Sequence, residues 1–218
     1  MAEKVIIKRE HVKECFDGRF VRLYDLQYAE GRHYFDASRR AVDDIFALKD
    51  DEEFKTALPD AVTVIVIVKG ETPRLLLSTE FRYPTGQFLL GAPAGLIDEA
   101  DKQTDNPLFS ATVREVKEET GISIKSHDQL SIVNPLLFST PGLSDECNAL
   151  ICALISEEDL GTLSTDGAEG TEVFGDFKIV TKEEAVKLLK DGRDEHGIFY
   201  SMYTWAALMY FVSDMWRR

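Results

Sequence analysis

One nine-residue stretch, R-E-V-K-E-E-T-G-I at residues 114–122, constrains this 218-residue chain more than any other. Upstream of it, Asn106 suits a helix N-cap and Pro107 suits the first helical position. Gly121 suits the left-handed residue that ends many helices. We therefore predict a helix over roughly residues 107–120.

The predicted helix has an apolar face and an acidic face. At about 100° per residue, Phe109, Val113 and Val116 fall on one side. The opposite side carries three carboxylates, those of Glu115, Glu118 and Glu119. Like charges at this spacing destabilise a helix by roughly 0.2–0.5 kcal/mol per pair unless a cation offsets the repulsion. Taken alone, such a run is more typical of a solvated face. The functional interpretation is a hard divalent cation, Mg²⁺ or Mn²⁺.

Three motifs in order resemble one enzyme family. Residues 114–122 match the second half of the Nudix box, R-E-U-x-E-E-x-G-U, where U is a bulky aliphatic residue. Residues 93–98, P-A-G-L-I-D, resemble the start of the box in the ADP-ribose pyrophosphatase branch, and residues 139–146 resemble the S-P-G-x-S-x-E segment that follows it. The resemblance covers residues 34–189. It implies an α/β fold, the Nudix α/β/α sandwich with a mixed β-sheet, preceded by an N-terminal antiparallel β annex.

The chain departs from the family pattern at two places. Eighteen residues separate Gly95 from Arg114 where the family has thirteen, so the first glutamate of the box is missing from its counted place. Counting forward from Gly95 reaches Asp101, and counting back from Arg114 reaches Asn106. Family members also usually carry a glutamate four residues before the box glycine, and this chain has Gly91 there. Both changes are expected to weaken the binding of metal or substrate.

The resemblance implies a set of metal ligands and catalytic groups. The metal ligands are the carboxylates of Glu115, Glu118 and Glu119 and the carbonyl of Ala94, with Mg²⁺ as the cation and Mn²⁺ as a second choice. Glu115 and Glu119 therefore count among the catalytic residues, and Arg114 is expected to orient Glu118. In this branch the general base is a glutamate on a loop after the box. Here the loop is residues 161–175, and it offers two glutamates, the favoured Glu172 and Glu169. Each is otherwise a solvated loop acid.

The resemblance also implies substrate contacts. Residues 34–40 resemble the family's W-E-x-x-x-R element, with Phe35 in the place of the tryptophan, Asp36 of the glutamate and Arg40 of the arginine. Phe35 would stack on the nucleobase; the alternative is a core phenylalanine in an amphipathic strand. Arg82, in a segment that resembles F-R-x-P-x-G, would contact a phosphate, and its alternative is a surface salt bridge. Leu96 of the P-A-G-L-I-D motif joins this set.

The implied activity is Mg²⁺-dependent hydrolysis of the diphosphate bond of a nucleoside diphosphate-sugar. ADP-ribose, cleaved to AMP and ribose 5-phosphate, is the favoured substrate, and GDP-mannose or another nucleotide sugar is the runner-up. A second class of function remains open. A module that senses ADP-ribose or a nucleotide sugar without cleaving it would also fit Gly91 and the missing box glutamate.

Charge and composition narrow the partners. A net charge of −14 argues against nucleic acid and against an anionic membrane surface. No apolar run approaches the roughly 20 residues that span a bilayer, and no leader segment is recognised, so we expect a cytoplasmic protein. Three cysteines without C-x-x-C spacing indicate neither a disulfide framework nor a zinc site, and we expect buried thiols. The predicted domains are the annex, residues 1–45, and the catalytic domain, residues 46–218, in a homodimer.

Apart from the catalytic helix, the pattern predicts six strands and two helices. Strands over residues 5–15 and 20–28 would be joined by an Asp17-Gly18 hairpin turn. An uninterrupted β-branched run at residues 61–68 indicates a strand that is buried on both faces. Further strands are expected at residues 74–81, 130–136 and 148–155, and further helices at 181–190 and 200–212.

Overall fold

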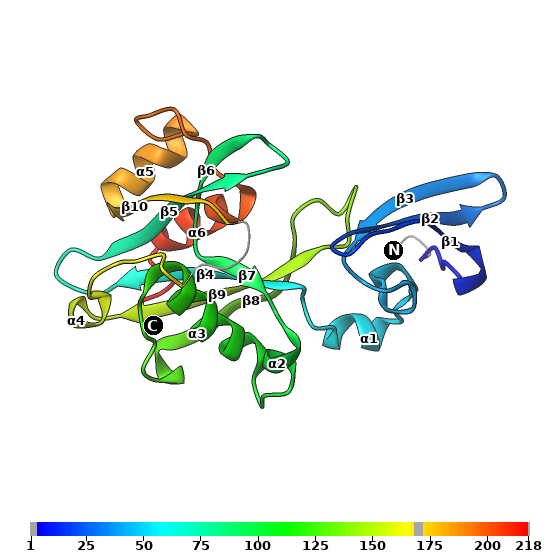
Figure 1. Ribbon diagram of the computed structural model, residues 1–218, viewed down its shortest axis with the longest axis horizontal. Coiled ribbons are helices and arrows are strands. Elements are labelled where there is room, and N and C mark those ends of the chain that lie inside the picture. The colour runs from blue at the N-terminus through cyan, green and yellow to red at the C-terminus, as the bar shows by residue number, and fades with distance from the viewer. Residues whose placement is uncertain (1–3, 168–171, 218) are drawn as a thin grey trace. The chain divides into compact units, whose positions relative to one another are not determined.

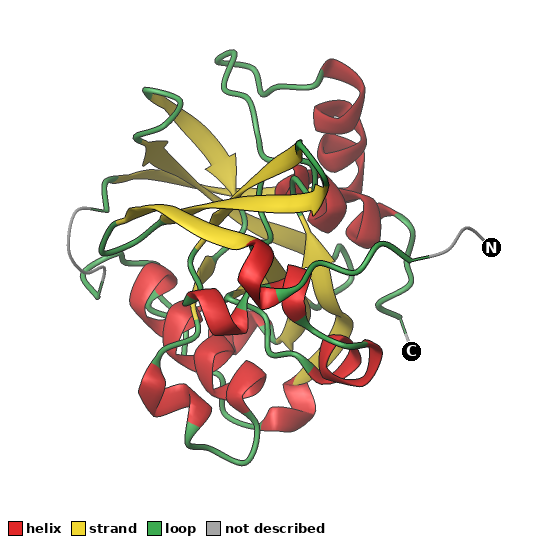
Figure 2. Ribbon diagram, turned by 90° about the vertical axis from the view of Figure 1, so that its right-hand side faces the viewer, coloured by secondary structure: helices red, strands yellow, loops and turns green. Residues whose placement is uncertain are grey.

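The computed structural model describes residues 4–167 and 172–217, and the chain divides into two compact units. The first unit consists of the chain up to Asp60 together with residues 136–148, and the second consists of residues 61–135 with the chain from Ala149 onward. Figure 2 distinguishes the helices, strands and loops of both units by colour. The predicted boundary between an annex and a catalytic domain after residue 45 is a statement about which parts fold independently, and it stays a prediction.

The first unit contains the predicted β annex. Its strands β1 (Val12–Asp17), β2 (Arg22–Ala29) and β3 (Arg32–Ser38) form an antiparallel sheet in that order. The predicted hairpin is confirmed, and its turn is closed by the Gly18 N–H, which donates to the Val21 carbonyl at 3.0 Å. The predicted first strand begins only at Val12, because a 3₁₀ turn, η1 (Arg9–His11), precedes it.

One face of this small sheet is covered by its own unit. Buried side chains of Val12, Tyr24 and Leu26 pack on Ile45. Ile45 lies among short helical turns, which are η2 (Val42–Asp44), η3 (Phe46–Leu48) and α1 (Asp51–Thr56). These strands therefore have a core within their own chain, and the homodimer stays a prediction. Large apolar side chains nevertheless stay exposed, among them Phe16, Phe20 and Phe35.

In the described part of the chain, the larger sheet is mixed and has seven strands. Strands β10, β5, β4, β9 and β8 lie side by side, β6 pairs with β5, and β7 pairs with β4. The bounds are β4 (Ala61–Val68), β5 (Arg74–Arg82), β6 (Gln87–Gly91), β7 (Ala94–Leu96), β8 (Leu130–Phe138), β9 (Cys147–Ile155) and β10 (Phe174–Thr181). Every residue of β4 is buried, as its β-branched run predicts. The sequence did not predict β6, β7 or β10.

Helices lie on both faces of this sheet (Figure 1). Helices α5 (Lys182–Asp191) and α6 (Met202–Val212), both predicted, pack into one apolar cluster with alternate residues of β4, β5 and β6. Helix α3 (Pro107–Thr120) packs against β4 and β7, next to the short α2 (Glu99–Lys102). The remaining short elements are η4 (His127–Gln129) and α4 (Glu157–Leu160). Among the described residues, no helix is long and apolar enough to cross a bilayer.

The cysteines divide by location. Cys147 and Cys152 are buried free thiols, as expected, but Cys15 is exposed on β1. The expectation of three buried thiols is therefore wrong for Cys15. This residue lies on a strand of which only Val12 is buried.

Candidate active site

Helix α3 has the predicted ends. The Asn106 side chain accepts a hydrogen bond from the Phe109 N–H at 3.2 Å, Pro107 is the first helical residue, and Gly121 adopts the left-handed conformation with φ of 77°. The structure also distinguishes the two interpretations of the acidic side. Glu115 and Glu119 are only 7% and 4% exposed. The acidic side of the helix is therefore not a solvated face.

The short strand β7 forms a cradle for these two carboxylates. A Cβ atom on Gly95 would lie 2.0 to 2.2 Å from the carboxyl atoms of Glu115, so the Glu115 side chain occupies the space that any larger residue would need. The backbone N–H of the preceding residue, Ala94, donates to Glu119 Oε2 at 3.2 Å. Strand β7 is itself fixed by antiparallel pairing with β4. The sheet therefore holds the backbone of Ala94 and Gly95 directly against the helix acids.

Burial changes the protonation of both acids. Desolvation raises the pKa of Glu115 to about 7, although the adjacent Arg114 guanidinium favours the ionised form. Desolvation also raises the pKa of Glu119 well above its usual range, and repulsion from Glu115, Glu80 and Glu172 adds to the effect. A group that carries positive charge would reverse these shifts.

Arg114 holds the acidic cluster together. Its Nη1 donates to Glu115 Oε1 at 2.7 Å and to Glu118 Oε2 at 3.0 Å, so the expected Arg114–Glu118 contact is present. Its Nη2 donates to the Leu96 carbonyl and to Asp101 Oδ2, both at 2.8 Å. These contacts make Arg114 a positioning residue.

The inserted segment supplies Asp101 from helix α2. Asp101 is 3% exposed, and it accepts hydrogen bonds from Arg114 and from the Ser110 hydroxyl. Burial opposes ionisation, but these hydrogen bonds prevail and lower the pKa of Asp101. Of the two residues reached by counting along the box, Asp101 contacts the catalytic helix through its arginine, whereas Asn106 caps the helix.

Arg82 ends strand β5 and therefore lies in the same unit as helix α3. The Arg82 side chain is about half exposed, and its Nη2 lies 2.6 Å from Glu80 Oε2. The salt bridge that was the alternative interpretation of Arg82 is thus present, and it leaves part of the guanidinium exposed. Next to it, the Phe81 N–H donates to the Val173 carbonyl at 2.8 Å. This bond ties the chain that follows Glu172 to β5.

The loop before β10 is fixed on both sides of its undescribed residues. Gly167 lies against helix α3, where an added Cβ would be 2.8 Å from Glu118 Cα, and the Ser164 N–H donates to the Thr120 carbonyl at 3.1 Å. The other candidate for the general base, Glu169, lies outside the described residues. Glu172 is exposed, and its charge raises the pKa values of Glu115, Glu119 and Glu80.

Three of the other predicted substrate residues lie in the first unit, whereas Leu96 ends β7 in the second. Phe35 is 52% exposed on β3, so it is not a core residue. Asp36 is buried, and its Oδ1 accepts from the Asp145 N–H at 3.0 Å. Burial, and then repulsion from Asp145, raises the pKa of Asp36 to about 6. Further hydrogen bonds to residues 142–146 bring two of the family motifs, residues 34–40 and 139–146, together in this unit.

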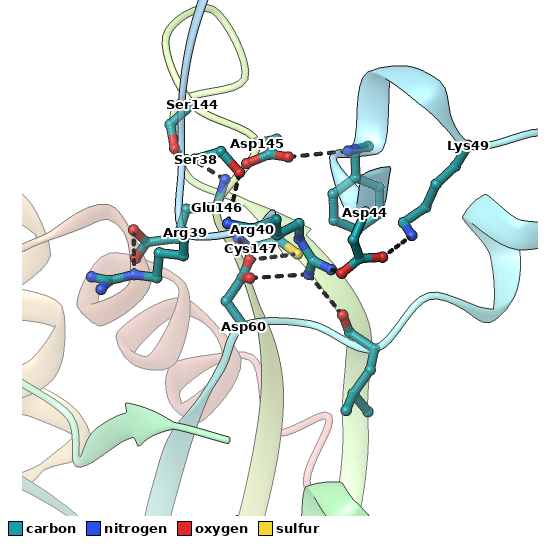
Figure 3. A network of polar contacts seen from close by, with 12 residues as sticks. Ser38, Arg39, Arg40, Asp44, Lys49, Asp60, Ser144, Asp145, Glu146 and Cys147 are labelled. Carbon is teal, nitrogen blue, oxygen red and sulfur yellow. Dashed lines mark hydrogen bonds and ion pairs between the residues drawn. The ribbon is translucent and has the colours of Figure 1, made fainter. Parts of the chain in front are cut away.

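Arg40 is occupied by contacts within its own unit (Figure 3). Its Nη1 contacts Asp44 at 3.2 Å, and its Nη2 contacts Asp60 at 3.0 Å and the Leu58 carbonyl at 2.8 Å. Its guanidinium also stacks on the Phe46 ring at 4.5 Å. Because both Nη groups bond to protein oxygens and the side chain is 9% exposed, this placement argues against the predicted substrate contact.

The donor set of α3 and β7 fits a hard divalent cation. The available groups are carboxylate oxygens and backbone, which are the ligands that Mg²⁺ and Mn²⁺ take. Among the described residues, no three acidic, histidine or cysteine side chains already surround one point. Instead, Glu115 and Glu118 face Arg114, and Glu119 faces the Ala94 N–H. Rotations of these side chains are therefore required to collect them around an ion.

Known proteins resemble this chain in sequence. Residues 57–203 match the NUDIX domain. An ADP-ribose pyrophosphatase of Saccharomyces cerevisiae is 27% identical over 161 residues, which cover 71% of this chain and 60% of the yeast protein. An ADP-sugar pyrophosphatase of Mus musculus is 26% identical over 140 residues, which cover 63% of this chain and 60% of the mouse protein. The chain thus matches only about three fifths of the length of these two relatives.

A solved structure shows the same fold. The crystal structure of an ADP compounds hydrolase superposes with a TM-score of 0.54 at 19% identity, covering 94% of this chain and 90% of that one. At this level of identity the likeness shows the fold alone. The chain belongs to the Nudix family.

Proposed function

We propose that this protein hydrolyses the diphosphate bond of a nucleoside diphosphate-sugar with the help of Mg²⁺, and that ADP-ribose, cleaved to AMP and ribose 5-phosphate, is its preferred substrate. The support for the substrate comes from the names of the yeast and mouse relatives, an ADP-ribose and an ADP-sugar pyrophosphatase, and from the three motifs of this branch. Another nucleotide sugar, such as GDP-mannose, is the runner-up.

The burial of Glu115 and Glu119 carries the proposal. Two buried carboxylates held side by side against a backbone cradle destabilise the fold unless they are protonated or neutralised by a cation. Nothing in the helix itself requires them, because the same positions on an ordinary core helix would be apolar. The presence of these two carboxylates at a packed surface is explained if they bind a divalent cation. Such a cation would neutralise charge on the diphosphate and activate water.

The chain's own residues then have distinct tasks. Glu115, Glu118, Glu119 and the Ala94 carbonyl are the proposed ligands, and Arg114 orients the first two carboxylates. The exposed part of the Arg82 guanidinium suits a phosphate oxygen. Glu172, which the Val173–Phe81 hydrogen bond holds beside β5, is the preferred general base, and Glu169 is the alternative.

The proposed contacts with the rest of the substrate are fewer. Phe35 offers an exposed ring for stacking on a base, and Asp36 lies next to it on β3. Leu96 is 43% exposed at the end of β7, beside the cradle. Its carbonyl is already bonded to Arg114, so only its side chain is free to contact substrate.

A sensor that binds nucleotide sugars without cleaving them is the second candidate. It is favoured by Gly91 and by the missing box glutamate, whose counted places hold Asp101 and Asn106. One experiment separates the two functions. The full chain is incubated with a panel of nucleotide sugars and Mg²⁺, and alkaline phosphatase is added to release phosphate from monoester products only. Phosphate release that is fastest with ADP-ribose is the expected result. Tight binding of ADP-ribose with no phosphate release would establish the sensor and overturn the hydrolase.

A further inference from the structure

The pairing of β5 with β6 places Glu80 near Gly91, the position where family members usually carry a glutamate. Gly91 ends β6 and pairs directly with Ser78 of β5. In an antiparallel pair, directly opposed residues point to the same face of the sheet, and so do residues two apart on one strand. A side chain at position 91 would therefore share a face with Glu80.

The catalytic helix lies on the same side of the sheet as that face. Leu75, Leu77 and Leu90 belong to the apolar cluster that packs on α5 and α6. Because side chains alternate along a strand, Glu80 and position 91 point to the opposite side. Helix α3 lies on that side of the sheet, against β4 and β7 (Figure 1).

The surroundings of Glu80 resemble those of the helix acids. Its side chain is 14% exposed, and one carboxylate oxygen is held by Arg82 at 2.6 Å. Across the sheet it pairs with Phe174 of β10, two residues after Glu172. Burial raises the pKa of Glu80, with Glu172 adding to the effect, and the charge of Glu80 in turn raises the pKa of Glu119. Three carboxylates from β5, α3 and the loop before β10 thus share one environment.

We infer that Glu80 supplies, from the neighbouring strand, the carboxylate that position 91 lacks, and that it is part of the group that binds the divalent cation. The inference rests on the proposed function, because it concerns the same cation. Arg82 fixes the orientation of the Glu80 carboxylate through one oxygen and leaves the second oxygen for the cation or one of its waters. Hydrogen bonds of this kind orient a metal ligand, and losing them typically lowers metal affinity by roughly 10- to 100-fold.

The test measures cation binding directly. Mn²⁺ affinity of the full chain is determined by isothermal titration calorimetry, and free Mn²⁺ is checked by electron paramagnetic resonance. Glu80→Gln keeps the shape of the side chain and removes its charge, and it should weaken Mn²⁺ binding by roughly 10- to 100-fold. The matched control is Glu71→Gln, which removes the same charge from an exposed turn before β5 and should leave the affinity unchanged.

A second variant tests whether a glutamate at position 91 can take the place of Glu80. Gly91→Glu, introduced into the Glu80→Gln protein, should restore most of the Mn²⁺ affinity. The structure permits this side chain, because an added Cβ at residue 91 would meet only the Ser78 carbonyl oxygen, at 3.9 Å, and Gly91 is not among the glycines with positive φ. Circular dichroism and melting temperature establish that each variant is folded.

The outcomes separate this inference from the function it rests on. If Glu80→Gln raises the KM for the nucleotide sugar but leaves Mn²⁺ affinity equal to that of Glu71→Gln, Glu80 serves only to hold Arg82, and the inference is overturned while the hydrolase stands. If Gly91→Glu does not restore Mn²⁺ affinity in the folded double variant, the claim that Glu80 takes the place of a glutamate at position 91 is overturned. If the wild-type chain binds no Mn²⁺ and cleaves no nucleotide sugar, the proposed function fails.

Discussion

Replacing a catalytic carboxylate should stabilise the metal-free protein. Glu115 is buried against Gly95, and its pKa rises from 4.5 to about 7 on folding. Below pH 4.5 the side chain is protonated in both the folded and the unfolded chain, so it makes no pH-dependent contribution to stability. As the pH rises from 4.5 to about 7, the unfolded chain releases this proton first. The free energy of unfolding therefore falls over this window and stays low above it.

The size of the effect follows from the shift. A difference of about 2.5 pKa units corresponds to about 3 kcal/mol at pH values above the folded pKa. Glu115→Gln is neutral at every pH and escapes this loss, and Arg114 keeps Glu118 and Asp101 as partners. For a chain of this length, about 3 kcal/mol corresponds to a rise of roughly 6–12 °C in melting temperature.

The assay compares melting temperatures of wild type and Glu115→Gln in EDTA between pH 4.5 and 8. The two proteins should melt together at the lowest pH, and the variant should melt higher at pH 8. Saturating Mg²⁺ should raise the melting temperature of wild type at pH 8 far more than that of the variant, and so narrow the gap. Glu118→Gln, on the same helix but with a side chain that is 31% exposed, serves as the control and should show a much smaller gain. A Glu115→Gln protein that is no more stable than wild type at pH 8 without metal would refute the argument.

Three further predictions concern catalysis and assembly. Glu119→Gln should lower turnover by orders of magnitude and leave the circular dichroism spectrum unchanged; a near wild-type rate would remove α3 from the mechanism. Glu172→Gln and Glu169→Gln, made separately, should divide into one variant with a roughly 10²- to 10⁴-fold loss in kcat and one with little change, with Mn²⁺ affinity kept in both; full activity in both would place the base elsewhere. The chain should scatter light as a homodimer, and Phe20→Asp, on the exposed apolar surface of the annex, should shift it towards monomer; a wild-type monomer at micromolar concentration would contradict the dimer.

Local signals in the sequence were enough to place the catalytic helix. Its bounds depend on an N-cap, a proline and a left-handed glycine, which act within a few residues of the helix ends. The strand at residues 61–68 was equally well defined, because its short length and its β-branched residues favour a buried strand over a buried helix. The hairpin of the annex follows from the Asp17-Gly18 turn, although its first strand starts later than the apolar pattern suggested.

Other features depend on contacts between distant residues. Strand β10 was not predicted, since its residues are mostly half-buried or exposed and its position comes from pairing with β5. Helical periodicity grouped Glu115 and Glu119 on one side of the helix, but it could not show that this side is buried. Their burial arises because β7 crosses this face of the helix, and Gly95 leaves room for one of the carboxylates. Likewise, the motif containing Arg40 looked like a substrate contact, and only the packing of Asp60 and Phe46 around it shows the guanidinium to be occupied.

Near each of the two departures from the Nudix box, the fold places a carboxylate that the sequence motif alone could not identify. The inserted segment folds into α2 and brings Asp101 to Arg114, with its pKa lowered by that contact. An anchored arginine in turn fixes Glu115 and Glu118 on α3. On the other side, the proposed role of Glu80 makes up for the loss at Gly91 through strand pairing. Losing Asp101 should therefore disturb the helix acids through Arg114, whereas losing Glu80 should act on the cation directly, so combining the two changes should lower Mn²⁺ affinity by roughly the product of their separate effects.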